Sequence, residues 1–359
     1  MNLKLKIIVT FLFLVSCVRQ PNEPINSTQT QTGQNGAFIL CEGLWGMDNS
    51  TLSRYDFKTG DLINDYFSNI NSGLRLGDLA NDIVIKGDTA FISVSTSKTI
   101  EVITVSTGKS LGRLYLNGNN CPRKICIVND TSAFITDLYA NCIYEFNPKT
   151  IAWKNLNIVV GPAPEGITKS EKYLFVANSG YGDYFANKPK AGTISVIDLI
   201  NRTEVASLIN LPDVIEVIYN AKNQKLYAAY NNLPSLKDST GGIVEFDADN
   251  FTELRRWKLN AKSISLSQTG DSLFFLSDSG ASLLNLNIIN SQPQLLIRNI
   301  INNEYWYSLA VSYYDYTIWI GNAKNYQVAG EIIIYDLKST ISPKIRFNVG
   351  VNPNKIVFF

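Results

Sequence analysis

The sequence predicts an all-β fold, a seven-bladed β-propeller whose C-terminal strand joins the N-terminal blade and closes the ring. Three observations predict it. A short strand signature centred on an aromatic residue occurs seven times. Its copies start 41 to 53 residues apart, which is about the length of a propeller blade. The seventh innermost strand lies at the C-terminus, whereas no apolar strand precedes the first signature.

The N-terminal residues predict export and a lipid anchor. Two lysines and no acidic residue precede an apolar run at residues 7–16, which is too short for a retained transmembrane helix. The run ends in Leu14-Val15-Ser16-Cys17, which is similar to a bacterial lipobox. We expect residues 1–16 to be a signal peptide, and residues 17–36 to be a lipidated Cys17 followed by a polar, flexible tether. The alternative is an ordinary signal peptide followed by a free cysteine.

The propeller is expected to occupy residues 37–359. The signature, which we assign to the second strand of each blade, lies at residues 37–39, 90–92, 133–135, 174–176, 226–228, 273–275 and 318–320. The expected innermost strands are 82–85, 124–128, 165–168, 215–219, 263–266, 309–312 and 355–359. Because only the tether precedes Ala37, the strand at 355–359 should complete the first blade. A β-helix or an open sandwich would also contain many short strands, but neither predicts this circular shift.

The composition excludes several classes of function. The chain has 32 basic and 31 acidic residues and no histidine. Such balanced charge lacks the basic surface with which proteins bind nucleic acids. Without histidine there is no Ser-His-Asp triad, no Cys-His dyad and no histidine-ligated zinc. We therefore expect a protein that is not an enzyme and that uses no metal and no cofactor.

The predicted binding site lies on one face of the ring. Strands alternate in direction within a blade, so the loops from second to third strand share a face with the connections between blades. On this face the loops are long and aromatic, and aromatic rings and asparagine amides suit a large ligand rich in amide or hydroxyl groups. The candidate ligand-binding residues on these loops are Trp45, Asn49, Tyr139, Asn141, Asn178, Tyr181, Tyr184, Trp306, Asn322, Tyr326 and Asn352. Each aromatic ring could instead pack against a neighbouring loop.

Three charged residues complete the predicted site. Asp78, Arg123 and Glu165 are expected at blade starts near the central channel, where a buried charge must be paired or solvated. They could orient a ligand, or they could pair with one another. No Asp-x-Asp-x-Asp loop is present, so the sequence predicts no calcium site.

Four cysteines follow Cys17: Cys41, Cys121, Cys126 and Cys142. An exported chain permits disulfides, and Cys121 with Cys142 is the pair expected near one face of a single blade. Cys126 lies within an expected innermost strand, where a buried thiol acts as a small apolar side chain.

Several segments resemble the YVTN-type propeller lipoproteins of Bacteroidetes, and among them the cobalamin-capturing surface proteins of the BtuG kind. The clearest are Glu-Gly-Leu-Trp-Gly at 42–46 with Asn49, Thr-Asp-Leu-Tyr at 136–139 with Asn141, Val-Ala-Asn-Ser at 176–179 and Gly-Val-Asn-Pro at 350–353, together with 77–78, 122–123 and 164–166. The likeness covers about all seven blades. It implies an outer-membrane lipoprotein, on the cell surface or the periplasmic face, that captures a nutrient for a TonB-dependent transporter.

The aromatic face and the resemblance together indicate a non-catalytic protein that binds a bulky small molecule, of which a cobalamin-type corrinoid is the most specific version. The alternative is a propeller that binds a protein or glycan partner on the same face. A calcium-dependent lactonase or a quinoprotein is a third interpretation, against which the lack of histidine and of metal-ligand spacing weighs.

Overall fold

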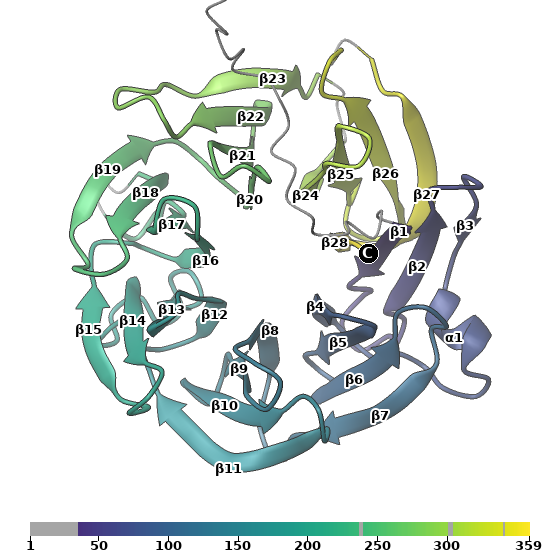
Figure 1. Ribbon diagram of the computed structural model, residues 1–359, viewed down its shortest axis with the longest axis horizontal. Helices are drawn as coiled ribbons and strands as arrows, with labels where there is room; N and C mark the ends of the chain where they lie inside the picture. The colour runs from purple at the N-terminus through teal and green to yellow at the C-terminus, as the bar shows by residue number, and fades with distance from the viewer. Residues whose placement is uncertain (1–34, 237–239, 301–303, 340–341) are drawn as a thin grey trace, which may run out of the picture. The chain divides into compact units, whose positions relative to one another are not determined.

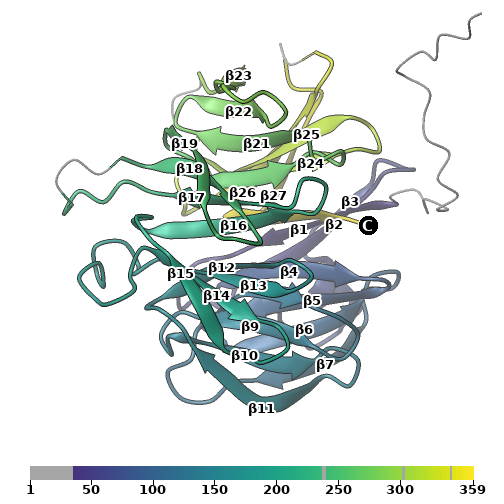
Figure 2. The same cartoon turned by 60° about the vertical axis from the view of Figure 1, so that its left-hand side comes forward.

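The predicted propeller is confirmed by the computed structural model, which describes residues 35–236, 240–300, 304–339 and 342–359. These residues form seven antiparallel sheets of four strands each, arranged in a ring (Figures 1 and 2). The expected signal peptide, and Cys17 with most of the tether, lie outside the described residues. No helix in the described part of the chain is long and apolar enough to cross a membrane.

The first four blades, each given from its innermost strand outward, come from the N-terminal part of the chain. Blade 1 contains β28 (Pro353–Phe358), β1 (Gly36–Cys41), β2 (Thr51–Asp56) and β3 (Leu62–Ile63). Blade 2 contains β4 (Ala80–Lys86), β5 (Thr89–Val94), β6 (Thr99–Thr104) and β7 (Ser110–Tyr115). Blade 3 contains β8 (Pro122–Ile127), β9 (Ala133–Asp137), β10 (Cys142–Asn147) and β11 (Ala152–Val159). Blade 4 contains β12 (Pro164–Lys169), β13 (Tyr173–Asn178), β14 (Thr193–Asp198) and β15 (Glu204–Leu208).

The remaining three blades follow the same order. Blade 5 contains β16 (Val214–Asn220), β17 (Lys225–Tyr230), β18 (Gly242–Asp247) and β19 (Glu253–Lys258). Blade 6 contains β20 (Ser263–Leu266), β21 (Ser272–Ser277), β22 (Gly280–Asn285) and β23 (Gln294–Arg298). Blade 7 contains β24 (Trp306–Ser312), β25 (Thr317–Asn322), β26 (Ala329–Asp336) and β27 (Ile345–Val351).

The C-terminal strand closes the ring as predicted. β28 pairs antiparallel with β1, so that Ile356 lies opposite Ile39 and Phe358 opposite Ala37 (Figure 1). β28 begins two residues before the expected strand. This pairing covers the inner edge of β1, and β28 takes the innermost position that one strand of every other blade also occupies.

The second strand of each blade carries the core, which explains the repeated apolar signature. In β1 every residue is buried. Alternate side chains point to opposite faces of a sheet, and Phe38 packs in a cluster with Ile83 and Ile92 of blade 2, whereas Ile39 packs in a cluster with Trp319 of blade 7. A strand covered by neighbours on both faces must be apolar at successive positions, which gives the Ala-Phe-Ile pattern.

Blade 1 has an outer edge that the sequence pattern did not predict. Its outermost strand, β3, has only two residues, and the short helix α1 (Tyr66–Ile70) follows it. Tyr66 and Phe67 of α1 are buried in the apolar cluster between blades 1 and 2. The helix therefore covers apolar surface that a longer outer strand covers elsewhere.

Candidate functional site

The loops expected on one face do lie together, and we call this the upper face. Backbone hydrogen bonds join loops between the second and third strands to connections between blades: Leu138 N donates to Cys121 O at 2.9 Å, and Ala323 N donates to Tyr305 O at 2.8 Å. Ser50 N likewise donates to Gly77 O at 3.0 Å. The upper face is therefore a continuous surface built from both kinds of loop.

Bulges at the starts of the innermost strands direct side chains to the centre of this face. In six of the seven innermost strands the register shifts next to the first residue, and β20 is the exception. A bulge leaves residues out of the ladder and re-aims their side chains. The residues left unpaired are Asn81, Arg123 and Lys124, Glu165 and Gly166, Ile215, Tyr307, and Asn354.

Two of these bulged residues, Arg123 and Glu165, form a partly buried ion pair. Arg123 Nε lies 2.9 Å from Glu165 Oε2. Burial opposes the charge of Arg123, but the carboxylates of Glu165 and Glu42 outweigh burial and raise its pKa above the ordinary value. Of the two roles left open by the sequence, the structure shows pairing with each other. Because the Arg123 side chain is still 20% exposed, this fixed ion pair remains accessible to a ligand.

Glu42 and Tyr307 form a second pair, close enough for the carboxylate of Glu42 to affect Arg123. The hydroxyl of Tyr307, in blade 7, donates to Glu42 Oε2 at 2.9 Å. Burial and the neighbouring carboxylate of Glu42 raise the pKa of Tyr307 well above its ordinary value. We call Glu42, Arg123, Glu165 and Tyr307 the central cluster. Neither Glu42 nor Tyr307 was among the predicted site residues.

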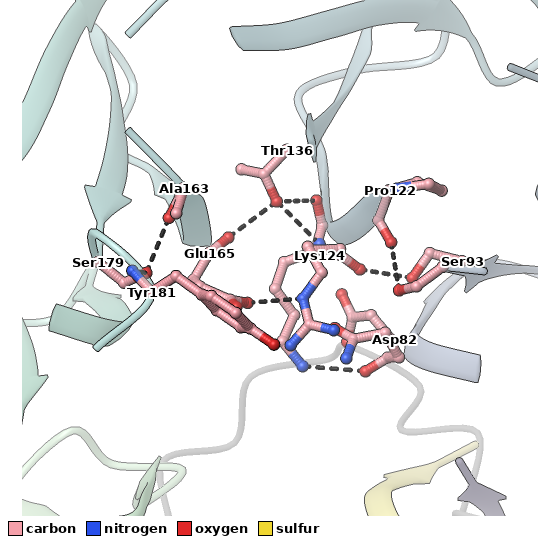
Figure 3. A network of polar contacts seen from close by, with 12 residues as sticks. Asp82, Ser93, Pro122, Lys124, Thr136, Ala163, Glu165, Ser179 and Tyr181 are labelled. Atoms are coloured by element: carbon pink, nitrogen blue, oxygen red, sulfur yellow. Dashed lines mark hydrogen bonds and ion pairs between the residues drawn. The ribbon is translucent and has the colours of Figure 1, made fainter. Parts of the chain in front are cut away.

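Hydrogen bonds between the Thr136 hydroxyl and the backbone of two strands support the central cluster. The hydroxyl of Thr136 donates to Glu165 O at 2.8 Å and accepts from Lys124 N at 2.9 Å. Figure 3 shows Thr136 between these two residues, with Tyr181 on the side of Glu165. The innermost strands of blades 3 and 4 are thereby tied together next to the ion pair.

A second group of charged residues surrounds the centre of the ring, below the central cluster. Lys124 Nζ donates to Asn81 O at 2.9 Å, and Lys355 Nζ lies 3.7 Å from Asp82 Oδ1. Burial lowers the pKa of Lys124 and raises the pKa of Glu216. No group of three or more Asp, Glu or Cys side chains that could hold a metal occurs in the described residues.

Exposed aromatic rings flank the central cluster in two groups. In the first, the rings of Tyr181 and Tyr184 meet edge to face with their centres 6.2 Å apart. Tyr139 lies near this pair: burial is the main cause of its raised pKa, and Tyr181 and Tyr184 raise that pKa further. In the second, Tyr326 lies 5.4 Å from Tyr305 and 5.6 Å from Tyr307. The predicted residues Tyr139, Tyr181, Tyr184 and Tyr326 are thus brought together around the charged centre.

Trp45 is held out from the upper face by a tight loop. Gly46 N donates to Asp78 Oδ2 at 2.8 Å, and Leu44 N donates to Asn49 Oδ1 at 2.8 Å. Trp45 between these anchors is 78% exposed. Asp78 and Asn49 therefore position the loop, and Trp45 and Met47 are its exposed large side chains.

Four predicted site residues instead serve the fold. Asn178 is fully buried, accepts from Gly161 N at 3.0 Å and donates to Thr193 and Ser195. Asn322 is also fully buried, and its amide donates to Glu331. Their amides satisfy neighbouring groups at strand ends, which leaves no free face for a ligand.

The other two of these residues are Asn352 and Trp306. Asn352 is buried and donates to Gly43 O at 3.0 Å. Trp306 was predicted in a loop, but β24 begins at this residue, and its indole is buried in the blade 7 core with Nε1 donating to Glu304 at 2.9 Å. Asn141 is exposed, yet its Oδ1 accepts from Ala163 N at 3.1 Å. We assign Asn141 to positioning the interblade connection.

The four cysteines in the described residues are free, buried thiols. Cys121 and Cys142, the pair considered for a disulfide, are therefore not bonded to each other. Burial raises the pKa of each of the two to about 11. Cys126 is buried in β8, as predicted.

Comparison with known proteins shows the family and the fold. A family model described as a domain of unknown function (DUF5074) matches residues 35–349. No curated protein matches the chain.

Solved propellers of low identity share the architecture. A quinonprotein alcohol dehydrogenase-like protein from Bacteroides thetaiotaomicron is 14% identical, with a TM-score of 0.71, and 90% of this chain and 78% of that chain are covered. A putative 6-phosphogluconolactonase from Bacteroides uniformis is 12% identical, with a TM-score of 0.64 over 91% and 100%. A functionally unknown protein from Desulfotomaculum acetoxidans is 14% identical, with a TM-score of 0.64 over 90% and 98%.

Proposed function

We propose that this chain, which belongs to the DUF5074 family, binds a bulky small molecule on its upper face and leaves that molecule chemically unchanged. One observation carries the proposal. Two groups of exposed aromatic rings flank a central cluster whose charged groups are already paired.

This arrangement suits binding of a large, partly polar ligand. Aromatic rings supply stacking area at a low entropic cost, because each has few rotatable bonds. The paired Arg123 and Glu165 can each form further hydrogen bonds with a ligand without leaving a charge unpaired. Positions fixed by strand bulges are preorganised, so little ordering is needed when the ligand binds.

The most specific version of the proposal is capture of a cobalamin-type corrinoid by a lipid-anchored protein of the outer membrane. It is supported by the resemblance described for residues 42–46, whose Trp45 is exposed on the upper face. In this version Cys17 carries the lipid, and the bound nutrient passes to a TonB-dependent transporter. Palmitate labelling of the wild type but not of a Cys17→Ser variant would support the anchor, and equal labelling of the two would reject it.

The binding proposal is tested by thermal-shift titration of residues 18–359 with cyanocobalamin. A ligand that binds only the native state stabilises it, by about 2.7 kcal/mol at a hundred times its Kd. We expect a saturable rise in Tm that is lost in a Tyr139→Ala, Tyr181→Ala double variant. Tyr316→Ala, which removes an exposed tyrosine in the turn between β24 and β25 on the opposite face, is the matched control and should bind like the wild type.

The outcomes separate the alternatives. No shift at any concentration would reject the corrinoid and favour a protein or glycan partner on the same face. Chromatographic recovery of altered ligand after incubation would reject non-catalytic binding and favour an enzyme, as the descriptions of two structural neighbours suggest for those proteins.

A further inference from the structure

A separate cavity lies in the outer wall of the ring, between blades 2 and 3. It has a volume of about 400 Å³ and is lined by the end of β7 with the connection after it, and by β10 and β11. Figure 1 shows the end of β7 next to the start of β11 at the outer rim. None of the lining residues belongs to the central cluster or to the aromatic groups of the upper face.

The aromatic residues of this cavity are held in place by the fold. The indole Nε1 of Trp153 donates to Tyr115 O at 2.9 Å. The Trp153 ring also meets Tyr144 edge to face at 6.1 Å and Phe146 at 5.9 Å. Tyr115 itself is 65% exposed. The cavity therefore offers a free phenol ring beside a rigid aromatic wall.

A strand bulge opens the cavity beside these rings. The pairing of β10 with β11 shifts register between Tyr144 and Phe146, and Asn155 on β11 adopts a left-handed conformation with φ +50°. A bulge bends its strand and turns side chains out of the ladder. Bending of β11 at this point exposes the polar side chains that line the cavity.

The uncommitted polar groups of the cavity are neutral amides. The side chains of Asn117, Asn155 and Asn157 are exposed and form no hydrogen bond with the residues that the structure describes. The charged lining residue, Glu145, is already paired with Lys154 at 2.9 Å and with Arg202. A charged ligand would find no free opposite charge among these groups.

We propose that this cavity binds a neutral sugar residue, alone or as part of a glycan. A sugar ring has an apolar face of C–H groups, which stacks on an aromatic ring, and hydroxyls, which both donate and accept. Asparagine amides provide both a donor and an acceptor for such hydroxyls. The volume lies in the range of small-molecule sites, which is about 300 to 1,000 Å³. This proposal does not depend on the proposed function of the upper face.

The test is saturation-transfer difference NMR with maltose, cellobiose and N,N′-diacetylchitobiose, and with glucuronic acid as the charged comparison. We expect saturable transfer to the C–H protons of at least one neutral disaccharide and a weaker response from glucuronic acid. Tyr115→Ala should weaken binding of that disaccharide by about tenfold, equivalent to about 1.4 kcal/mol. Asn157→Ala should also weaken it. Tyr184→Ala removes an exposed tyrosine of the upper face and should leave the affinity unchanged.

Thermal melting checks that each variant is folded, which we expect because Tyr115, Asn157 and Tyr184 are all exposed. No transfer to any of the three disaccharides at millimolar concentration would overturn the proposal. Equal affinity of the wild type and folded Tyr115→Ala and Asn157→Ala variants would also overturn it. Loss of binding in Tyr184→Ala alone would overturn the outer-wall site and move the sugar to the upper face. Cyanocobalamin plays no part in these measurements, so their failure leaves the corrinoid test unaffected.

Discussion

Replacing Ile356 with alanine should destabilise the whole ring, although it is the fourth residue from the C-terminus. Ile356 in β28 is 5% exposed and lies opposite Ile39 of β1. It packs in the cluster that also contains Trp319 and Ile332 of blade 7. The side chain therefore joins the first blade to the last, and its loss leaves a cavity at the closure of the ring.

The expected size of the effect follows from burial. Truncation of a buried isoleucine to alanine costs about 2 to 5 kcal/mol, and for a domain of this size each kcal/mol lowers the Tm by about 2 °C, which gives a decrease of about 4 to 10 °C. The matched control is Ile200→Ala, because Ile200 is 88% exposed in the turn after β14. The control should change the free energy of unfolding by no more than about 0.5 kcal/mol.

Thermal and guanidinium unfolding, followed by circular dichroism, would measure both variants. If β28 closes the ring, Ile356→Ala should shift the unfolding transition of the entire propeller. A variant as stable as Ile200→Ala would refute the reasoning. The reasoning would also be refuted if β28 frayed in a small early transition while the main unfolding transition stayed at the wild-type temperature.

Two further predictions concern ionisable groups. Burial alone would raise the pKa of Glu145, but hydrogen bonds from Ser132 and Lys154 and the charges of Arg202 and Lys154 outweigh burial and lower this pKa. The ionised Glu145 therefore stabilises the folded protein above the ordinary glutamate pKa, and this stabilisation is lost as the pH falls through the lowered pKa. The difference in free energy of unfolding between the wild type and Glu145→Gln, measured by denaturation at several pH values, should therefore shrink on acidification, and a constant difference would contradict this. The thiols of residues 18–359 should not react with Ellman's reagent at pH 8 in the native protein, because burial raises their pKa values to about 11 or 12, and all should react in guanidinium. The thiols concerned are those of Cys41, Cys121, Cys126 and Cys142. A titre of two thiols in guanidinium would instead indicate one disulfide.

The blade pattern was predictable because each second strand is covered on both faces. Successive buried positions, such as those of β1 around Phe38, produce an apolar run that recurs once per blade. The circular shift was predictable from the order of the strands alone. The helix α1 was not, since five residues are too few to show a helical period.

The candidate site was only partly predictable. Tyr139 and Tyr181 lie in loops between strands, where exposed aromatic residues are expected. Asn178 and Asn322 lie at the ends of β13 and β25, where an amide can serve either the backbone or a ligand, and the sequence does not distinguish the two. Trp306 was misplaced because β24 begins three residues before the expected strand.

The contact between Glu42 and Tyr307 joins residues that no local sequence pattern connects. These residues lie 265 positions apart and meet only because the ring closes. Alignment of the innermost strands would have placed Tyr307 at the same position as Arg123 and Glu165, each following the first residue of its strand. The repeat therefore contains a signal for the centre of the site, at the second residue of each of these innermost strands.

Closure by β28 also sets the order of events in folding. The inner partner of β1 comes last in chain order among the described strands, so the first blade remains incomplete until residues 353–358 have been synthesised. Pairings of such high sequence separation form slowly, and an unpaired strand edge can associate with other chains in the meantime. A protein of this architecture that crosses a membrane N-terminus first would need its earliest blade protected during the whole of translocation. Its yield in the cell should then depend on chaperones more than its final stability suggests.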